Sequence, residues 1–370
     1  MSESKELFTS FRPVSKAEWI KKIEEDLKGK AYESLFRQTP EGLLLEPVHH
    51  RDDRKGKSNF RFSAENRPWI KRQNFRFENT AAALSKMNAL AGSAFEAIGF
   101  HFDRTAPVED PGPLFKEASR LNLSLHLESD SPELKEALLN WANSEPGLAA
   151  KAKGSIGGGA IFPGAPDPGL RRAMPGMKQL LVNDFYNEPA PDNLIIDISL
   201  TLKKLNALLQ RASRAGWSGD EIVEDLLIQL VVGPDFFREL ARLRALRMLA
   251  ANLLLLHHPN TKHPDGFLLH AVVRAGAEED AYRGLLKGGT TALAALAGTA
   301  DMLSIDSSAR SAELSTDEIQ RLSRNIQLLF AYEVKATRVA DPYRGSYYVE
   351  TLSEKMAEAA WAHFTQSSET

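Results

Sequence analysis

Short apolar segments alternate with longer amphipathic segments along most of the chain after about residue 70. Segments with helical periodicity, such as 80–95 and 235–256, lie between most of the apolar ones. The segments with the length and composition of β-strands are IGFHF (98–102), LSLHL (123–127), LLVNDF (180–185), LIIDISL (194–200), LLIQLVV (226–232), FLLHAVV (267–273) and MLSID (302–306). Strands that are apolar almost throughout are typical of a parallel sheet covered by helices.

Seven or eight such units over about 290 residues favour a (β/α)8 TIM barrel over an open sheet. We therefore predict an α/β protein with an N-terminal helical arm at 1–60 and a (β/α)8 barrel at 61–370. In the arm, Ser15 and Glu18 have the spacing of a capping box. The apolar residues that follow it on one helical face are Trp19, Ile20, Ile23 and Leu27. A second capping box, Ser315 with Glu318, predicts a late helix of the barrel.

The stretch KGSIGGGAIFPGAPDPG (153–169) interrupts the alternation. Its glycines are compatible with a phosphate-binding loop, but no Gly-Lys-Ser/Thr follows them. Six glycines and three prolines in 17 residues are more typical of a mobile loop. We favour the loop, which on a barrel can also serve as a lid.

Composition narrows the classes of function without choosing one. The 46 basic and 49 acidic residues give a net charge of −3, so no overall field attracts nucleic acid or an anionic membrane. The absence of cysteine excludes disulfides, thiolate nucleophiles and zinc–thiolate sites, and it fits a cytoplasmic protein. The N-terminus lacks the apolar core of a signal peptide, and AANLLLL (250–256) is too short to span a membrane.

Nine residues, RPWIKRQNF (67–75), combine cations, an aromatic ring and amides. They resemble the segment RPWTIRQYAGF of methylmalonyl-CoA mutases. Three further segments are similar to motifs of the same family and occur in the same order; these are VVGPDFFRELARLRALRMLA (231–250), SRNIQLLFAYE (323–333) and VADPYRGSYYVETLSEKMAEAAW (339–361). The resemblance covers most of the chain and is weakest between about 105 and 220.

The resemblance implies a barrel that holds an acyl-CoA along its axis. It also implies adenosylcobalamin, carried by a separate C-terminal domain, which starts a radical rearrangement between succinyl-CoA and methylmalonyl-CoA. Some of these mutases are heterodimers with a small subunit that has the same fold and performs no catalysis. We expect only the barrel part here, because the D-x-H-x-x-G motif of the cobalamin domain does not occur in the chain.

The chain departs from the catalytic pattern at two positions of the barrel. Asn74 stands where the family's RQY motif has its tyrosine, so the aromatic ring beside the radical intermediate is lost. No histidine lies between His126 and His257, where catalytic relatives carry a GYHxxEAGA-like motif that contacts the thioester. The resemblance therefore assigns no catalytic residue and no cofactor-binding residue to this chain.

Recognition chemistry remains in the same stretch. By the resemblance, Arg67, Arg72 and Gln73 are candidates for binding a CoA ester, because a planar guanidinium can donate two parallel hydrogen bonds to phosphate. The family's threonine in this stretch is Ile70 here, so the set of hydrogen-bonding groups is incomplete. We favour the alternative that these arginines and Trp69 pack the barrel rim or an interface.

Three groups of histidines invite a metal or catalytic interpretation that we do not favour. His49 and His50 are adjacent in an extended segment, so their side chains point to opposite faces and rarely chelate one ion. His257 and His258 stand at the expected end of a long helix, where a cation complements the helix dipole. His270 lies inside a predicted strand and is expected to be a hydrogen-bonded interior residue. We predict no metal site.

Three functions remain open at this point. The first is a non-catalytic, small-subunit-type protein that pairs with a cobalamin-bearing large subunit and stabilises it. The second is an acyl-CoA isomerase barrel that uses a cobalamin domain on another chain. The third is a CoA-binding module without catalysis, which could self-associate as a homodimer.

Overall fold

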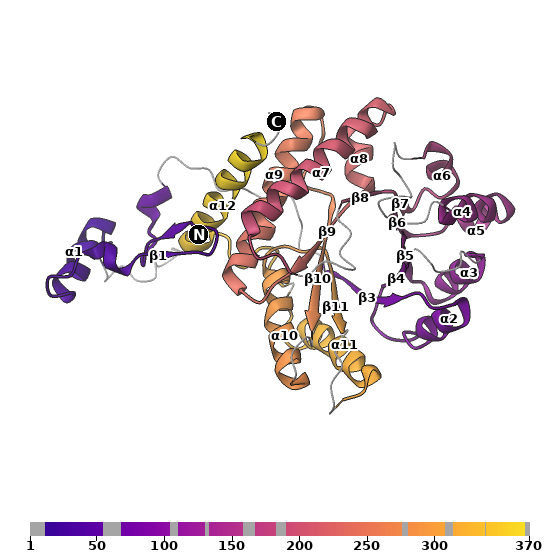
Figure 1. Ribbon diagram of the computed structural model, residues 1–370, viewed down its shortest axis with the longest axis horizontal. Helices are drawn as coiled ribbons and strands as arrows, with labels where there is room; N and C mark the ends of the chain where they lie inside the picture. Colours follow the sequence, from indigo (N-terminus) through magenta and orange to yellow (C-terminus); the bar gives the residue numbers. More distant parts are fainter. Residues whose placement is uncertain are drawn as a thin grey trace, which may run out of the picture.

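A curled parallel sheet surrounded by helices forms the main body of the computed structural model (Figure 1). The structure describes residues 12–54, 68–103, 110–129, 133–157, 167–182, 190–275, 280–307, 314–336 and 338–366. The sheet has the strand order β7-β6-β5-β4-β3-β11-β10-β9-β8. Its strands are β3 (Ile70–Arg76), β4 (Ala97–Phe102), β5 (Ser124–Ser129), β6 (Gly154–Gly157), β7 (Met177–Lys178), β8 (Leu180–Val182), β9 (Leu226–Val232), β10 (Leu268–Ala275) and β11 (Met302–Ser307).

The two ends of this sheet, β7 and β8, are consecutive in the chain and separated by Gln179 alone. Strand β7 pairs with β6, and β8 pairs with β9, so the two pieces together occupy one position of an eight-membered cylinder. The Asp225 carboxylate stabilises the break between them, because it accepts the backbone N–H groups of Gln179 and Leu180. The predicted TIM barrel is confirmed as a nearly closed parallel barrel with surrounding helices.

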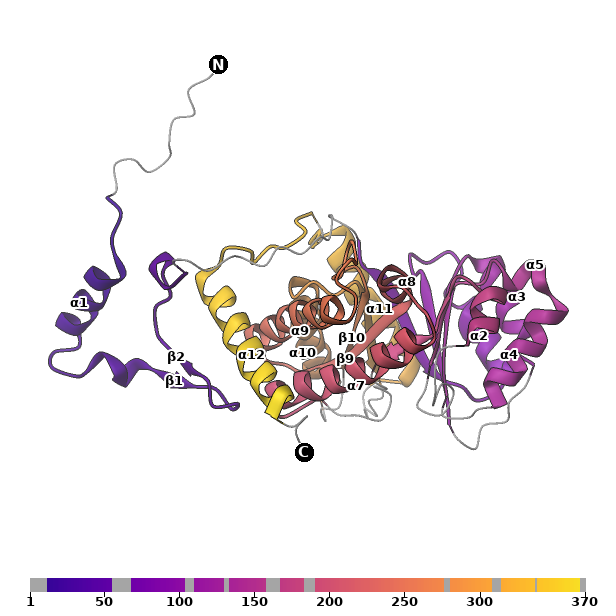
Figure 2. The same ribbon diagram turned by 90° about the horizontal axis from the view of Figure 1, so that it is seen from above.

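Helices cover the outside of the barrel (Figures 1 and 2). Their bounds are α2 (Thr80–Asn88), α3 (Gly112–Leu121), α4 (Glu133–Ser144), α5 (Pro146–Ala149), α6 (Pro168–Ala173), α7 (Leu194–Arg214), α8 (Gly219–Asp225), α9 (Phe236–His257), α10 (Ala281–Ala297), α11 (Thr316–Tyr332) and α12 (Tyr347–Gln366). Helix α11 begins at the predicted capping box, in which Ser315 and Glu318 satisfy each other's backbone N–H groups. Among the described helices, none is long and apolar enough to cross a membrane.

Alternate residues of each strand face the helices and form the apolar core. In β9, for example, Leu226, Ile228, Leu230 and Val232 belong to the larger buried cluster, whereas Gln229 does not. Strands β4, β5 and β6 contribute their outward residues to a second cluster with α2, α3 and α4. Because successive side chains of a strand point to opposite faces, the residues between them face the barrel axis.

The prediction of a strand at LIIDISL (194–200) was wrong, because these residues form the first two turns of α7. Asn193 caps the helix by accepting the N–H groups of Ile195 and Ile196. The buried side chains continue with helical spacing through Ile198, Leu202, Leu205 and Leu209. A short apolar run fits a buried strand and a buried helix equally well, and here the cap and the longer spacing decided.

The glycine-rich stretch is not wholly a loop either. Gly154–Gly157 form β6, which pairs with β5 on one side and β7 on the other. At Gly154 a Cβ atom would overlap the backbone of Leu125, so the absence of a side chain allows the close approach of the two strands. Residues 158–166, on which the predicted lid would depend, lie outside the described part of the chain.

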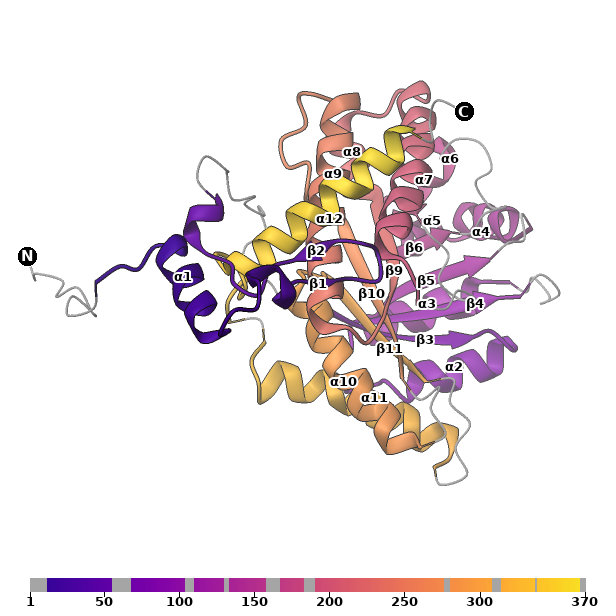
Figure 3. The ribbon, with the colours of Figure 1, turned by 60° about the vertical axis from the view of Figure 1, so that its left-hand side comes forward.

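The N-terminal arm leaves the barrel as an extended structure. Its elements are α1 (Lys16–Asp26), the 3-10 turns η1 (Tyr32–Leu35) and η2 (Arg51–Arg54), and the strands β1 (Arg37–Gln38) and β2 (Leu44–Leu45). Figure 3 shows β1 and β2 passing across α12, where Lys355 donates to the carbonyl oxygen of Leu44. Helix α1 lies farther out, away from the barrel (Figure 2).

The segment DPYRGSYYVE joins α11 to α12 and ties both to the arm. Arg244 of α9 donates to Asp341 at 2.6 Å and to Glu350 at 2.9 Å. Arg54 of the arm lies 3.9 Å from the same Glu350 carboxylate and 2.8 Å from Glu354. Gly345 has a φ of +82°, which favours glycine and permits the turn before α12. The segment therefore has a structural role.

Candidate functional site

Strand β3 presents the candidate residues on opposite faces. Arg72 and Asn74 point toward the barrel axis, where they contact residues of β5 and β11. Gln73 points outward and accepts a hydrogen bond from Arg324 of α11 at 3.2 Å. The third candidate, Arg67, lies outside the described residues. The structure therefore does not bring Arg72 and Gln73 together on one surface, because neighbouring residues of a strand face opposite ways.

Arg72 is at the centre of a buried polar network. Its side chain is 1% exposed, and its Nη2 donates to Glu128 Oε1 at 2.6 Å. Its Nε donates to Asn74 Oδ1 at 2.6 Å, and its Nη1 lies 3.4 Å from His270 Nδ1. Burial in a low-dielectric interior is tolerable for an arginine only when an anion and other acceptors surround it. The guanidinium is thus engaged by the protein's own carboxylate.

Gly99 of β4 provides the space for this arrangement. A Cβ atom at that position would overlap the Asn74 amide and the Arg72 guanidinium, with Arg72 Nε only 2.8 Å away. Any side chain at residue 99 would therefore displace the two groups that meet in front of it. The glycine is required here by close packing.

Asn74 occupies the position on β3 that faces the carboxyl-terminal mouth of the barrel. Its Nδ2 donates to Ser304 Oγ at 2.8 Å and lies 3.2 Å from both oxygens of Asp306. Burial raises the pKa of the Asp306 carboxyl to about 6, although the hydrogen bond from Asn74 and the charge of Arg72 oppose the rise. Both polar ends of the Asn74 amide are therefore used inside the network.

His270 connects the remaining strands of the network, as an interior histidine. Its Nδ1 lies 2.8 Å from Gln229 Oε1, and its Nε2 lies 3.0 Å from Ser304 Oγ. Gln229 Nε2 in turn donates to Glu128 at 3.3 Å. Burial, together with the positive charge of Arg72, lowers the pKa of His270 well below its ordinary value, so the ring is neutral at pH 7.

His126 lies beside the same network on β5. Its Nδ1 is 2.8 Å from Ser155 Oγ of β6, and the residue is 2% exposed. Burial lowers the pKa of His126 well below the ordinary value, and the charge of Arg72 adds to this effect. Within the described residues, its Nε2 has no hydrogen-bond partner.

Sequence reasoning did not single out Glu128, Gln229, Ser304 and Asp306, which complete the network. A signal for them was present, because each interrupts an otherwise apolar strand with a polar side chain: LSLHLES, LLIQLVV and MLSIDS. A polar residue in a strand that is apolar on both sides faces either a partner or a ligand. Only the arrangement of the strands shows that these residues are one another's partners.

A polar cavity of about 400 Å³ opens above the network, at the carboxyl-terminal end of β3 and β11. Its lining includes Asn74, Asp306, Arg274 and Lys86, but it does not include Arg72 or His270 beneath them. Lys86 is already paired with Glu78 at 2.7 Å. Over the described residues, the cavity therefore ends at the layer of Asn74 and Asp306, and side chains fill the barrel axis below it.

The histidines at the end of α9 are placed as predicted. His257 is the last helical residue and contacts Asn206 Oδ1 at 2.7 Å, and His258 contacts Ser213 Oγ at 2.8 Å. His49 packs edge-on against Tyr348, and His50 Nδ1 lies 3.1 Å from Asp52. These contacts account for the four rings as structural residues.

Comparison with known proteins adds the family context to this geometry. The family model described as methylmalonyl-CoA mutase matches residues 170–370. The methylmalonyl-CoA mutase small subunit of Porphyromonas gingivalis is 25% identical over 410 residues, which cover 100% of this chain and 66% of that protein. The methylmalonyl-CoA mutase of Cereibacter sphaeroides is also 25% identical, covering 93% of this chain and 57% of that protein.

A large subunit is among the relatives as well. The methylmalonyl-CoA mutase large subunit of Propionibacterium freudenreichii subsp. shermanii is 29% identical over 197 residues, which cover 52% of this chain and 27% of that protein. The chain thus spans less than two thirds of the length of each of these relatives.

Proposed function

The chain belongs to the methylmalonyl-CoA mutase family, and we propose that it is a non-catalytic member of the small-subunit type. Its role in this proposal is to pair with a cobalamin-bearing mutase large subunit and to stabilise it. The observation that carries the proposal is the occupied barrel axis. Where an acyl-CoA would have to pass, the Arg72–Glu128 ion pair and the side chains of Gln229, His270 and Ser304 bond to one another.

The residues at the mouth of the barrel also do not fit the radical chemistry of adenosylcobalamin. The resemblance places an aromatic ring between substrate and corrin, whereas Asn74 directs a short amide inward to Arg72, Ser304 and Asp306. The network leaves neither end of this amide for a substrate. We therefore derive no catalytic step for this chain, and in the proposal the large subunit would carry the cofactor.

The proposal treats the barrel as a scaffold whose outer surface makes the contact. The arm supports this, because it extends beyond the barrel and carries exposed apolar side chains such as Trp19, Leu35 and Leu44. The lack of cysteine agrees with a cytoplasmic complex of this kind.

The proposal is tested by mixing the chain with a cobalamin-bearing mutase large subunit and measuring the mass of the mixture by light scattering. We expect a stable complex and a rise in the large subunit's melting temperature, because a ligand that binds only the folded state stabilises it by mass action. A mixture of separate species with an unchanged melting temperature would count against the pairing. Mutase turnover by this chain with adenosylcobalamin and a separate cobalamin domain would favour the isomerase alternative.

Binding of a CoA ester through Arg67, Arg72 and Gln73 remains a prediction, with less support from the geometry. Arg72 would have to leave Glu128, and Gln73 faces α11. Calorimetry with CoA and with desulfo-CoA distinguishes the cases, and we expect no binding heat. A signal that Arg72→Ala abolishes would restore the CoA-binding alternative.

A further inference from the structure

Helix α1 has the features of a helix that packs against something, yet it packs against little of its own chain. It is 11 residues long, and the Ser15–Glu18 capping box fixes its start. Trp19, Ile20 and Ile23 lie on one face, but no residue of the helix is buried, and Trp19 is 49% exposed. Isolated helices shorter than about 12–15 residues are marginal in water, so a helix of this length needs a surface for its apolar face.

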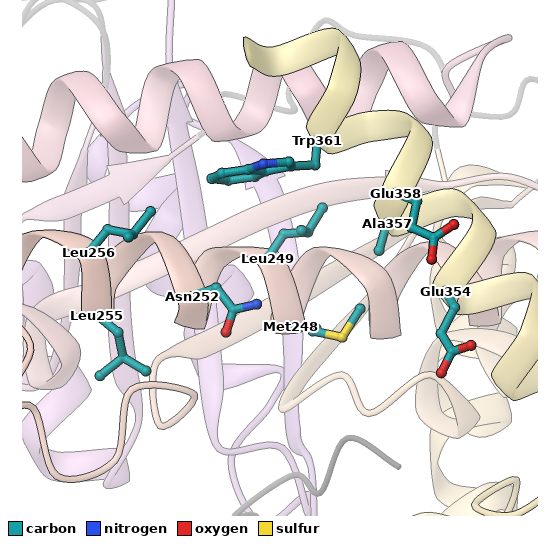
Figure 4. Close-up of a pocket in the computed structure, with 9 residues that line it drawn as sticks. All are labelled: Met248, Leu249, Asn252, Leu255, Leu256, Glu354, Ala357, Glu358 and Trp361. Carbon is teal, nitrogen blue, oxygen red and sulfur yellow. The ribbon is translucent and has the colours of Figure 1, made fainter. Parts of the chain in front are cut away.

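A groove with the complementary property lies between α9 and α12 (Figure 4). It has a volume of about 700 Å³. Most of its lining is apolar and consists of Met248, Leu249, Leu255, Leu256, Ala357 and Trp361. Leu256 is 67% exposed, which is unusual for a leucine at the end of an otherwise buried helix. The sticks in Figure 4 show Trp361 of α12 and Leu256 of α9 at the same end of the groove.

The two surfaces match in length. Along α9 the groove runs from Met248 to Leu256, a rise of about 12 Å at 1.5 Å per residue. The apolar face of α1 runs from Trp19 to Leu27, which is the same number of residues and therefore also about 12 Å. A helix can lie between two others with its apolar ridge in the groove that they form.

The charges at the edges are also compatible. Glu358, which lines the groove, is exposed on α12. Lys22 lies beside the apolar face of α1, and its ion pairs with Asp26 and Glu25 are exposed. Exposed pairs of this kind stabilise little, so Lys22 can exchange its partner at low cost.

We propose that α1 of one copy of this chain lies in the α9–α12 groove of a second copy, and that the exchange is reciprocal. Within one chain, α1 does not line the groove, because the β1–β2 segment is held on α12 by Lys355 and α1 lies beyond it (Figures 2 and 3). Reciprocal exchange covers both apolar surfaces at once and closes with two-fold symmetry. This inference concerns self-association, so it stands apart from pairing with a large subunit.

The test uses the full chain in the absence of any large subunit, with the dissociation constant measured by analytical ultracentrifugation. We expect a dimer, and Trp19→Glu and Leu256→Glu should each weaken it about tenfold or more, because each places a charge in the apolar contact. A mixture of the two variants should recover part of the affinity, since one sound arm can still meet one sound groove. Leu286→Glu, on the exposed face of α10, is the matched control and should change nothing.

The absence of cysteine allows a second, direct measurement. The double variant Lys22→Cys, Glu358→Cys should form a disulfide between two chains under mild oxidation, seen as a doubled mass without reductant. Lys22→Cys with Glu117→Cys on α3 should not. A monomer at all concentrations, or a dimer that Trp19→Glu and Leu256→Glu leave unchanged, would overturn the proposal. A chain that is monomeric alone yet binds a large subunit would overturn only this inference and leave the proposed function standing.

Discussion

The barrel axis and the N-terminal helix α1 treat their side chains in opposite ways. In the axis, charged and polar groups from β3, β5, β9, β10 and β11 are buried and bonded to one another. In α1, an apolar face remains without a buried residue. The axis has become self-sufficient, whereas the arm depends on a surface elsewhere. A protein that has lost a ligand site and kept an association surface would show this division.

The largest effect should come from the axis. Glu128→Ala leaves the Arg72 guanidinium buried without its anion, and we expect a loss of about 3–5 kcal/mol in the free energy of unfolding. Urea denaturation at one protein concentration measures it. The matched control is Glu117→Ala, which breaks a pair with the exposed Arg120 and should cost less than about 1 kcal/mol.

The double variant Arg72→Met, Glu128→Leu sharpens this result. Replacing both charges by apolar side chains removes the uncompensated ion, so most of the lost stability should return. If Glu128→Ala were no worse than Glu117→Ala, the ion pair would not be buried in the axis, and the self-sufficient interior would be disproved.

Asp306 should give the next largest effect, and one that depends on pH. Its pKa in the folded protein is about 6, above its ordinary value of 3.8, so the folded state holds the proton more tightly than the unfolded state. The resulting stabilisation is complete below pH 3.8 and is lost as the pH rises through 6, by about 3 kcal/mol. Unfolding free energies from pH 4 to pH 7 should therefore fall more steeply for the natural protein than for Asp306→Asn. Parallel curves would contradict the burial of this carboxyl.

Gly99→Ala tests the packing of the axis without touching a charge. The added methyl group would overlap the Arg72 and Asn74 side chains, and overpacking of this kind typically costs about 1–3 kcal/mol. Thermal unfolding measures the loss. Gly147→Ala, where a Cβ atom would meet nothing within 4 Å, is the control, and equal effects at the two sites would argue against close packing in front of β4.

The smallest effects compare the same local motif in the two regions. Ser315→Ala removes the cap of α11, which packs on the barrel, and should cost about 1 kcal/mol of global stability. Ser15→Ala removes the equivalent cap of α1 and should change the global value by less than about 0.5 kcal/mol, because α1 shares no buried core with the barrel. Amide exchange in α1 should instead become faster. An equal loss at both sites would show that the arm is part of the barrel's folding unit.

Local patterns predicted much of this fold. Strands β4, β5, β9, β10 and β11 lie within two residues of their predicted positions, and both capping boxes form as the serine–glutamate spacing indicates. The exception, α7, shows the limit of the method, because its first residues are as apolar as a buried strand. For the site, the sequence identified Arg72 and Asn74, but it did not show Glu128, which stands 56 residues away.

By itself, the sequence determined the alternation of strands and helices, the helix starts and the membership in a mutase family, since each depends on residues that are close along the chain or on motifs in order. The tertiary structure alone decided that Arg72 faces the axis while Gln73 faces α11, and that the axis is filled. Closure of the barrel across Gln179 brings five distant strands to one axis, and the partners of a buried charge are fixed only by that long-range geometry.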